Sequence, residues 1–290
     1  MLIEQQIRLG LLRGPGKQEA LRRAGLELID EDGKSYPLLG GRVPVLLPDM
    51  QQADAYARSS KRMNKDYSAT GMESARSPLQ RLKAFLTQDY RTKSSRNAFA
   101  ALFRTKDDLV LSVGGGPLRP HPQLTNLNIG PFPNVDVVAD AHVLPYRDVV
   151  VDAIYCEAVL EHLKAPHAAL AEMHRVLKPN GLILAITPFL QAYHGYPHHY
   201  QNFTLTGHCA ALEGAGFTIV ESGTCVGPMY TMVSLTSTVL AEYLPKFIGV
   251  PLRAVWWICG VFLRPLDLLI ARRQNAHIVA STTYVLASKN

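Results

Sequence analysis

From Leu109 to the last residue, short apolar segments alternate with turns rich in glycine and proline, and this pattern constrains the fold more than any other feature. The segments are rich in Val, Ile and Leu without regular polar alternation, as in strands that are covered on both faces. We predict strands at 109–113, 126–129, 135–139, 152–156, 182–187, 217–221 and 278–287, and helices at 166–177 and 206–215. This order predicts an α/β fold with a largely parallel sheet over residues 109–290.

The residues before Leu109 divide into two regions. Residues 1–50 contain two apolar runs separated by turns at Asp32-Gly33 and Gly40-Gly41, which predicts a small β module. Residues 51–108 are predicted to form a basic linker with a docking helix that begins at Ser77. Residues 58–96 carry ten Lys/Arg and three Asp/Glu, a net charge of +7. A solvated surface explains this charge, and because no recognition motif accompanies it we do not expect a nucleic-acid partner.

The composition predicts the size of the core and the cellular compartment of the protein. With 290 residues, of which 47% are hydrophobic and 19% charged, the chain can bury a sizeable core. Its four cysteines include no C-x-x-C pair, which predicts reduced thiols in a cytoplasmic protein and neither a disulfide framework nor a zinc set. Charged residues interrupt the first 23 positions, so we expect no secretory signal there.

Residues 226–273 form an unusually apolar insert before the last predicted strand. Its longest uninterrupted apolar run, residues 254–263, is flanked by Arg253 and Arg264 and is too short to span a bilayer. The Trp256-Trp257 pair suits a helix that lies in a membrane interface. We therefore predict a helical insert whose residues 228–271 lie on a membrane surface, so that the protein is cytoplasmic and peripheral at a membrane. A hydrophobic lid or a dimer face is the alternative.

Three consecutive glycines, Gly114, Gly115 and Gly116, directly follow the first strand predicted after Leu109. Glycine permits a sharp turn and lets a ligand approach the main chain, although a tight turn alone would also explain the three glycines. Together with VLSVGGGP, the segments VDVVADAHVLPY, VDAIYCEAVLEHL and AEMHRVLKPNGLILAITPF resemble, in order and spacing, the motifs of class I S-adenosylmethionine-dependent methyltransferases of the type-11 branch. The earlier segment GKSYPLLGGRVPVLLPD resembles a zinc-ribbon-like module without its cysteines, so no structural zinc is expected.

The resemblance implies a Rossmann-like class I methyltransferase sheet with S-adenosyl-L-methionine as cofactor. The glycine loop would hold the methionine end, the end of the second strand would meet the ribose, and the third strand would end at the adenine. The residues after the fourth strand would lie beside the methyl group. The implied cofactor-binding residues are Gly114, Gly115, Gly116, Pro117, Asn128, Ile129, Asp140, Ala141, Glu157 and Ala158.

Three residues depart from the family pattern. Ser112 replaces an acid, Leu118 replaces the third glycine, and Asn128 replaces the acid that accepts hydrogen bonds from the ribose. An uncharged amide makes the weaker contact, which predicts lower cofactor affinity. The first two connections are also shorter than the dozen or so residues that a parallel crossover normally needs, so we predict that their helices are missing and the adenosine site is more open.

Histidines supply the candidate catalytic groups. His194 and His198 lie in the aromatic segment after the fifth strand, His162 follows the fourth strand, and each is a candidate base for an acceptor that must lose a proton. The alternatives are a solvent-facing helix start at His162 and ordinary loop packing for the others. The i, i+4 spacing of His194 and His198 would suit zinc on a helix, but Gly195 and Pro197 argue against a helix, so no metal site is expected.

The favoured hypothesis is methyl transfer to a small-molecule acceptor that is lipophilic or lipid-linked. A catalytically inactive methyltransferase-like binding or scaffold protein is the first alternative, motivated by the three departures from the family pattern. An RNA methyltransferase that uses the basic linker is the second, and it predicts association that weakens steeply with salt.

Overall fold

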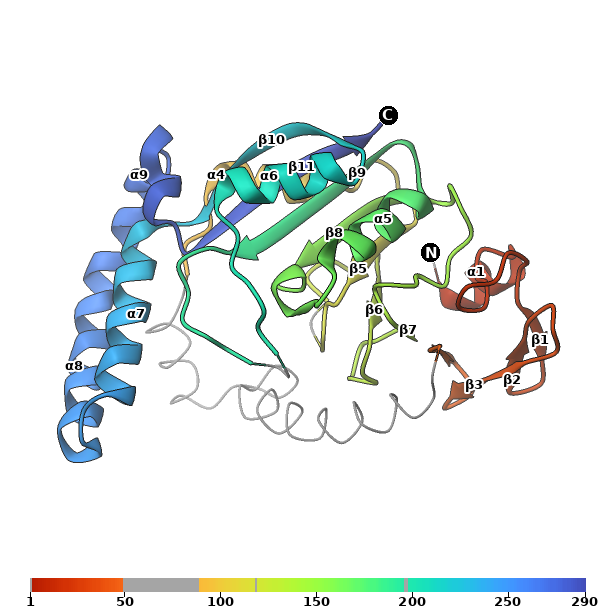
Figure 1. Cartoon of the computed structure of the whole chain (residues 1–290), viewed down its shortest axis with the longest axis horizontal. Helices are drawn as coiled ribbons and strands as arrows, with labels where there is room; N and C mark the ends of the chain where they lie inside the picture. The colour runs from red at the N-terminus through yellow and green to blue at the C-terminus, as the bar shows by residue number, and fades with distance from the viewer. Residues whose placement is uncertain (1, 49–88, 118, 196–197) are drawn as a thin grey trace.

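The computed structural model describes residues 2–48, 89–117, 119–195 and 198–290. Its strands form one sheet in the order β1-β2-β3-β4-β7-β6-β5-β8-β9-β11-β10 (Figure 1). The section from β7 to β9 is parallel, and β11 is antiparallel to both of its neighbours, β9 and β10. The predicted Rossmann-like α/β sheet is confirmed. The bounds of these central strands are β5 (Val110–Val113), β6 (Leu124–Asn128), β7 (Val137–Ala139), β8 (Val151–Glu157), β9 (Leu177–Pro188), β10 (Phe217–Val226) and β11 (Thr282–Lys289).

The predicted strands match these elements, with differences mainly at their ends. Every residue of β5, β6 and β7 is buried, which explains why β5 and β7 are largely apolar without alternation. In β6, with the sequence LTNLN, three buried residues are polar. The largest difference is at β9, which begins at Leu177 directly after the preceding helix, five residues before the start of the strand predicted at 182–187. A register shift between Val151 and Ala153 in the β8–β9 ladder accommodates this irregular start.

Two layers cover the sheet. On one face α5 (Pro166–Val176) packs through Leu170 and Met173, and α6 (Leu205–Gly214) is capped by Thr204, whose Oγ1 accepts from Gly207 N at 3.0 Å. On the other face lies α4 (Lys93–Ala100), whose buried Ala98 belongs to a second core cluster. The first face also receives α1 (Ile3–Arg8), where Gln6 Nε2 donates to Thr125 Oγ1 of β6 at 2.8 Å.

The first two crossovers contain no helix among the described residues, as predicted. Instead, Phe132 and Val135 of the β6–β7 loop pack against Val138 of β7 and Val45, which pairs with it on the neighbouring strand. The β5–β6 loop is tied down by Asn126, whose Nδ2 donates to Gly116 O at 2.9 Å. Main-chain and amide contacts therefore take the place of crossover helices on this part of the sheet.

The N-terminal strands extend the main sheet. They are β1 (Arg22–Ala24), β2 (Glu27–Ile29), β3 (Ser35–Leu39) and β4 (Val43–Leu46). They form an antiparallel meander, and β4 then pairs in parallel with β7, with Val45 opposite Val138. Residues 1–50 thus contain a helix as well as strands and continue the sheet through β4. The docking helix predicted from Ser77 lies outside the described residues.

The apolar insert is helical, as predicted. It consists of α7 (Pro228–Glu242), α8 (Lys246–Leu263), η2 (Arg264–Leu266) and α9 (Asp267–Ile270), and η3 (Gln274–Val279) connects it to β11. The two long helices pack together and project from one end of the sheet (Figure 1). The uninterrupted apolar run at residues 254–263 is too short to span a bilayer. In the structure, however, the helical stretch Lys246–Ile270 is 25 residues long and meets the length and hydropathy criteria for a membrane span.

Candidate functional site

The glycine turn lies at the carboxyl end of β5. Gly114 and Gly116 have φ values of +75° and +56°, which favour glycine. A Cβ on Gly114 would lie 2.2 Å from Val159 Cγ2, and one on Gly115 would lie 2.5 Å from Asn126 Oδ1, so packing alone accounts for these two glycines. Among the described residues, nothing lies within 4 Å of a Cβ built on Gly116. The Cα side of Gly116 therefore faces open space, where a ligand can approach it, while its carbonyl oxygen accepts from Asn126 Nδ2.

Asn128 and Asp140 end the two neighbouring strands at the same edge of the sheet. Asn128 is the last residue of β6, is 8% exposed, and donates from Nδ2 to Gly130 O at 3.4 Å. Asp140 directly follows β7, and its Oδ1 accepts from His142 N at 2.8 Å. Because carboxyl ends of adjacent parallel strands meet at one edge, Gly116, Asn128 and Asp140 share the edge where α/β sheets bind ligands.

These groups fit the adenosyl cofactor. Open main chain at Gly116 suits the methionine carboxylate and ammonium, the Asn128 amide can hydrogen-bond a ribose hydroxyl, and the Asp140 carboxylate can accept from an amino group. Half-buried Ile129 and buried Ala141 adjoin the two polar residues. Pro117 is described and ends the glycine turn, whereas Leu118 lies outside the described residues.

Glu157, the last residue of β8, is held by Arg91, which the sequence analysis did not single out. Arg91 Nη2 lies 2.5 Å from Glu157 Oε1, and Arg91 Nη1 lies 3.3 Å from Oε2. The Tyr155 hydroxyl also donates to Oε2, and burial together with this carboxylate raises the pKa of Tyr155. The next residue, Ala158, is exposed with φ +54°, a conformation that non-glycine residues adopt mainly at sites where surrounding structure enforces it.

The three candidate histidines do not come together as one set. His162 ends η1 (Leu160–His162), and His194 lies in the loop after β9, with ring centroids 5.1 Å apart. His199, which the sequence analysis passed over as a base, lies 4.3 Å from His194 by the same measure. His198 is exposed, and its main-chain carbonyl oxygen accepts a hydrogen bond from His162 Nδ1 at 2.6 Å.

Glu161 lies beneath these rings. Its side chain is fully buried, and Oε1 lies 3.7 Å from His162 Nε2 and 3.9 Å from His194 Nε2. The interaction with the Glu161 carboxylate raises the pKa of His194. The signal for Glu161 in the sequence was only its place beside His162, because nothing local reveals that a loop more than 30 residues later covers it.

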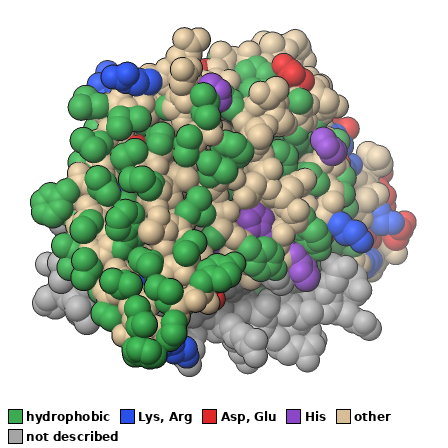
Figure 2. Space-filling model, turned by 60° about the vertical axis from the view of Figure 1, so that its left-hand side comes forward, with side chains coloured by type: hydrophobic (Ala, Val, Ile, Leu, Met, Phe, Trp, Pro, Cys, Tyr) green, Lys and Arg blue, Asp and Glu red, His purple; other side chains and the backbone are tan. Residues whose placement is uncertain are grey.

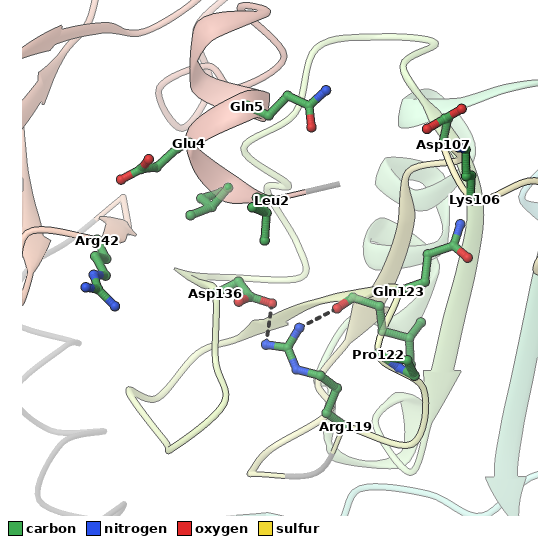
Figure 3. Close-up of a pocket in the computed structure, with 12 residues that line it drawn as sticks. Leu2, Glu4, Gln5, Arg42, Lys106, Asp107, Arg119, Pro122, Gln123 and Asp136 are labelled. Atoms are coloured by element: carbon green, nitrogen blue, oxygen red, sulfur yellow. Dashed lines mark hydrogen bonds and ion pairs between the residues drawn. The ribbon is translucent and has the colours of Figure 1, made fainter.

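A separate cavity of about 680 Å³ lies at the opposite edge of the sheet, at the amino ends of β6 and β7 (Figure 3). Arg119 enters it from the β5–β6 loop, with Nη2 2.7 Å from Asp136 Oδ2 and Nη1 donating to Leu124 O at 2.7 Å. Because Arg119 is anchored to the strand starts, this cavity does not contribute to the edge formed by Gly116, Asn128 and Asp140.

Apolar side chains gather on the outer side of the insert, which we call the hairpin face (Figure 2). Its most exposed members are Phe247 at 81%, Tyr243 at 80% and Phe262 at 76%. The inner side is tightly packed: a Cβ on Gly249 would lie 2.3 Å from Leu240 O, and one on Gly260 would lie 2.7 Å from Val233 Cγ1. The two helices are thus in close contact with each other, while their apolar outer side faces away from the other described elements.

Comparisons with known proteins agree with the fold. Residues 123–185 match the methyltransferase-domain family. Over 101 residues the chain is 35% identical to a ubiquinone/menaquinone biosynthesis C-methyltransferase, UbiE, of Enterobacter sp. (strain 638), covering 32% of this chain and 37% of that protein. The match to the same enzyme of Klebsiella pneumoniae (strain 342) has the same extent. The chain thus spans less than two fifths of these curated relatives.

Two solved structures are similar over much of the chain. One is a Haemonchus contortus phosphoethanolamine N-methyltransferase 2 bound to phosphomonomethylethanolamine and S-adenosylhomocysteine, with 14% identity, coverage of 68% of this chain and 52% of that chain, and a TM-score of 0.43. The other is a geranyl diphosphate C-methyltransferase of Streptomyces coelicolor A3(2), with 10% identity, coverage of 68% and 80%, and a TM-score of 0.41.

Proposed function

We propose that this chain is an S-adenosylmethionine-dependent methyltransferase that acts on a lipophilic or lipid-linked small molecule at a membrane surface. The observation that carries the enzymatic part is the open main chain at Gly116, with Asn128 and Asp140 on the same sheet edge. The match of residues 123–185 to the methyltransferase-domain family supports it. Within this proposal residues 1–50 are a cysteine-free counterpart of a zinc-ribbon-like module, supported by the short antiparallel meander β1–β4.

The cofactor, when bound, supplies an activated methyl group on a sulfonium. The chain supplies alignment and exclusion of water: Gly116 binds the methionine end through its main chain, Asn128 hydrogen-bonds the ribose, and Asp140 accepts from the adenine. An acceptor that must lose a proton would meet the polar cluster of Glu161, His162 and His194 beyond the ends of β8 and β9.

Calorimetric titration with S-adenosylmethionine tests the enzymatic part. We expect binding by the wild type and at least tenfold weaker binding by Asn128→Ala and Asp140→Ala, because each variant removes one polar contact. Gln123→Ala, at the opposite cavity, is the matched control and should bind as the wild type does. No heat and no thermal shift at millimolar cofactor would overturn the proposal and favour the scaffold alternative.

Three features of the hairpin face support the membrane part. The 18-residue α8 contains no acidic residue, and exposed Lys246 and Arg253 lie among its apolar side chains, as in helices that bind anionic lipid. Exposed Arg272 and Arg273 follow α9. Finally, the helical stretch Lys246–Ile270 meets the criteria for a span, yet only 11% of its most apolar window is buried within the chain. We therefore propose a cytoplasmic protein that is peripheral at a membrane.

Sedimentation with vesicles of phosphatidylcholine and phosphatidylserine tests this part. Inserting a phenylalanine side chain contributes about 1.5–3 kcal/mol, so Phe247→Ser/Phe262→Ser should lower the partition coefficient at least tenfold. Leu26→Ser is the control, since Leu26 is 69% exposed but lies in the turn between β1 and β2, at the end of the sheet opposite β10. Equal partitioning of both variants contradicts the membrane part, and a wild-type dimer that the double variant dissociates assigns the hairpin face to a second copy.

A further inference from the structure

We propose that Glu161, His162 and His194 form a binding site for a divalent metal ion of the zinc type. One potential ligand atom from each residue lies within 4.8 Å of the other two. Glu161 and His162 come from η1 after β8, and His194 comes from the loop after β9, so the site joins two segments that parallel pairing places side by side. The proposal concerns metal binding and holds or fails independently of methyl transfer.

The orientation of the two imidazoles is the first argument. A carbonyl oxygen can only accept, so His162 Nδ1, 2.6 Å from His198 O, and His194 Nδ1, 3.0 Å from Ala192 O, must each carry the hydrogen. In the neutral rings Nε2 then bears a lone pair, and each Nε2 is the atom nearest Glu161 Oε1. Histidine ligands of metals are held in this way, with the other ring nitrogen donating to a carbonyl or carboxylate.

The buried carboxylate is the second, independent argument. Glu161 has 0% side-chain exposure, and among the described residues neither Oε1 nor Oε2 has a hydrogen-bond partner. A buried carboxylate that lacks hydrogen bonds is strongly disfavoured unless a cation is close to it. When both rings are neutral, the neighbouring groups are two nitrogen lone pairs, which repel the carboxylate, and either a proton on a ring or a bound cation removes this repulsion. A cation between the three atoms converts this repulsion into three favourable contacts.

Chemistry and geometry favour zinc or a similar borderline metal. Two imidazoles with one carboxylate suit Zn²⁺ better than Mg²⁺, which prefers oxygen ligands. Ligands about 2.0–2.2 Å from a tetrahedral zinc lie about 3.4 Å apart. The Glu161–His162 and Glu161–His194 separations of 3.7 and 3.9 Å approach this value. All three potential ligand atoms lie within 4.8 Å of one another, so the side chains would have to move closer together around the ion.

Three protein ligands leave a fourth position open, as in catalytic rather than structural zinc sites. His162 and His194 have 18% and 32% of their side chains exposed, so solvent or an acceptor oxygen can reach the site from the histidine side. The site therefore suits an acceptor with a hydroxyl, phosphate or carbonyl oxygen. With metal bound, both Nε2 atoms are ligands, so the metal and not a histidine would polarise that oxygen.

Titration of tag-free full-length protein with Zn²⁺ tests the proposal, with Co²⁺ absorption as a second readout of coordination by imidazole and carboxylate. We expect one ion per chain, and at least tenfold weaker binding by Glu161→Gln, His162→Ala and His194→Ala. His198→Ala keeps the carbonyl that orients His162 and should bind as the wild type does. Exposed His167, in α5, supplies the second control, His167→Ala.

Thermal unfolding separates lost binding from lost folding. Without metal, Glu161→Gln should unfold at the same temperature as the wild type or higher, because the substitution removes a buried charge. Added Zn²⁺ should raise the unfolding temperature of the wild type but not of Glu161→Gln. The proposal is wrong if the wild type does not bind Zn²⁺, in which case protons alone balance Glu161, or if His194→Ala binds as tightly as the wild type.

Discussion

Arg91 holds the carboxylate of Glu157 through both of its terminal nitrogens, with Nη2–Oε1 and Nη1–Oε2 distances of 2.5 and 3.3 Å. The pair joins the segment before α4 to the last residue of β8, where the acceptor would meet the cofactor in the proposed enzyme. Because 27% of the Glu157 side chain and 39% of the Arg91 side chain are exposed, the pair is partly shielded from water.

Arg91→Ala should therefore destabilise the protein by about 1–3 kcal/mol, since it leaves a partly buried carboxylate with fewer partners. A double-mutant cycle with Glu157→Gln, followed by urea denaturation, isolates the pair itself from other losses. Arg91→Lys keeps the charge but cannot bind both carboxylate oxygens, so its stability should lie between those of the wild type and Arg91→Ala. A coupling free energy near zero would show that the pair contributes nothing to folding.

Asn128→Asp should strengthen binding of S-adenosylmethionine about fivefold, because a charged acceptor makes the stronger hydrogen bond to a hydroxyl. Calorimetry measures the change. Gln123→Glu adds the same charge at the amino end of β6, where the separate cavity lies, and should leave the affinity unchanged. If Asn128→Asp folds normally and binds no more tightly, the ribose does not lie at the end of β6.

His208 should make the protein less stable as the pH falls. It is fully buried in α6, its Nδ1 lies 3.2 Å from both Thr187 Oγ1 and Thr283 Oγ1, and burial lowers its pKa from 6.5 to about 3. Between pH 6.5 and about pH 3, His208 is protonated in the unfolded chain but neutral in the folded chain. The free energy of unfolding is therefore not reduced by His208 above pH 6.5, and it falls by about 1.4 kcal/mol per pH unit as the pH decreases below that value.

Urea denaturation at pH 7.5, 6.0 and 5.0 measures this slope. His208→Gln should flatten it over this range, whereas His167→Gln, at an exposed position, should retain the slope of the wild type. The assignment fails if the wild type and His208→Gln lose stability in parallel.

Gly249→Ala should loosen the contact between α7 and α8, since the added Cβ would lie 2.3 Å from the main-chain oxygen of Leu240. We expect a loss of about 1–3 kcal/mol from this overpacking. Both tryptophans of the chain, Trp256 and Trp257, lie in α8, so tryptophan fluorescence during denaturation reports on the hairpin. Gly214→Ala, in a helix position with nothing within 4 Å, should be neutral or stabilising, and an equal loss in both variants would contradict the packing argument.

Local sequence determines the strands and the helices α5 and α6, because an unbroken apolar run and the spacing of Leu170 and Met173 are properties of neighbouring residues. It also determines the sharp turn after β5, since Gly114 and Gly116 adopt positive φ values that other residues avoid. The missing crossover helices follow from connections too short and too rich in proline to contain them.

Tertiary structure alone decides which distant groups meet. Pairing of β8 with β9 brings His194 against Glu161 and leaves His198 with only its carbonyl in the cluster, which no sequence spacing indicates. Packing between α7 and α8 likewise selects which apolar side chains stay exposed, among them Phe247 and Phe262. Secondary structure depends on residues a few positions apart, whereas a site depends on contacts whose partners are set by the path of the whole chain.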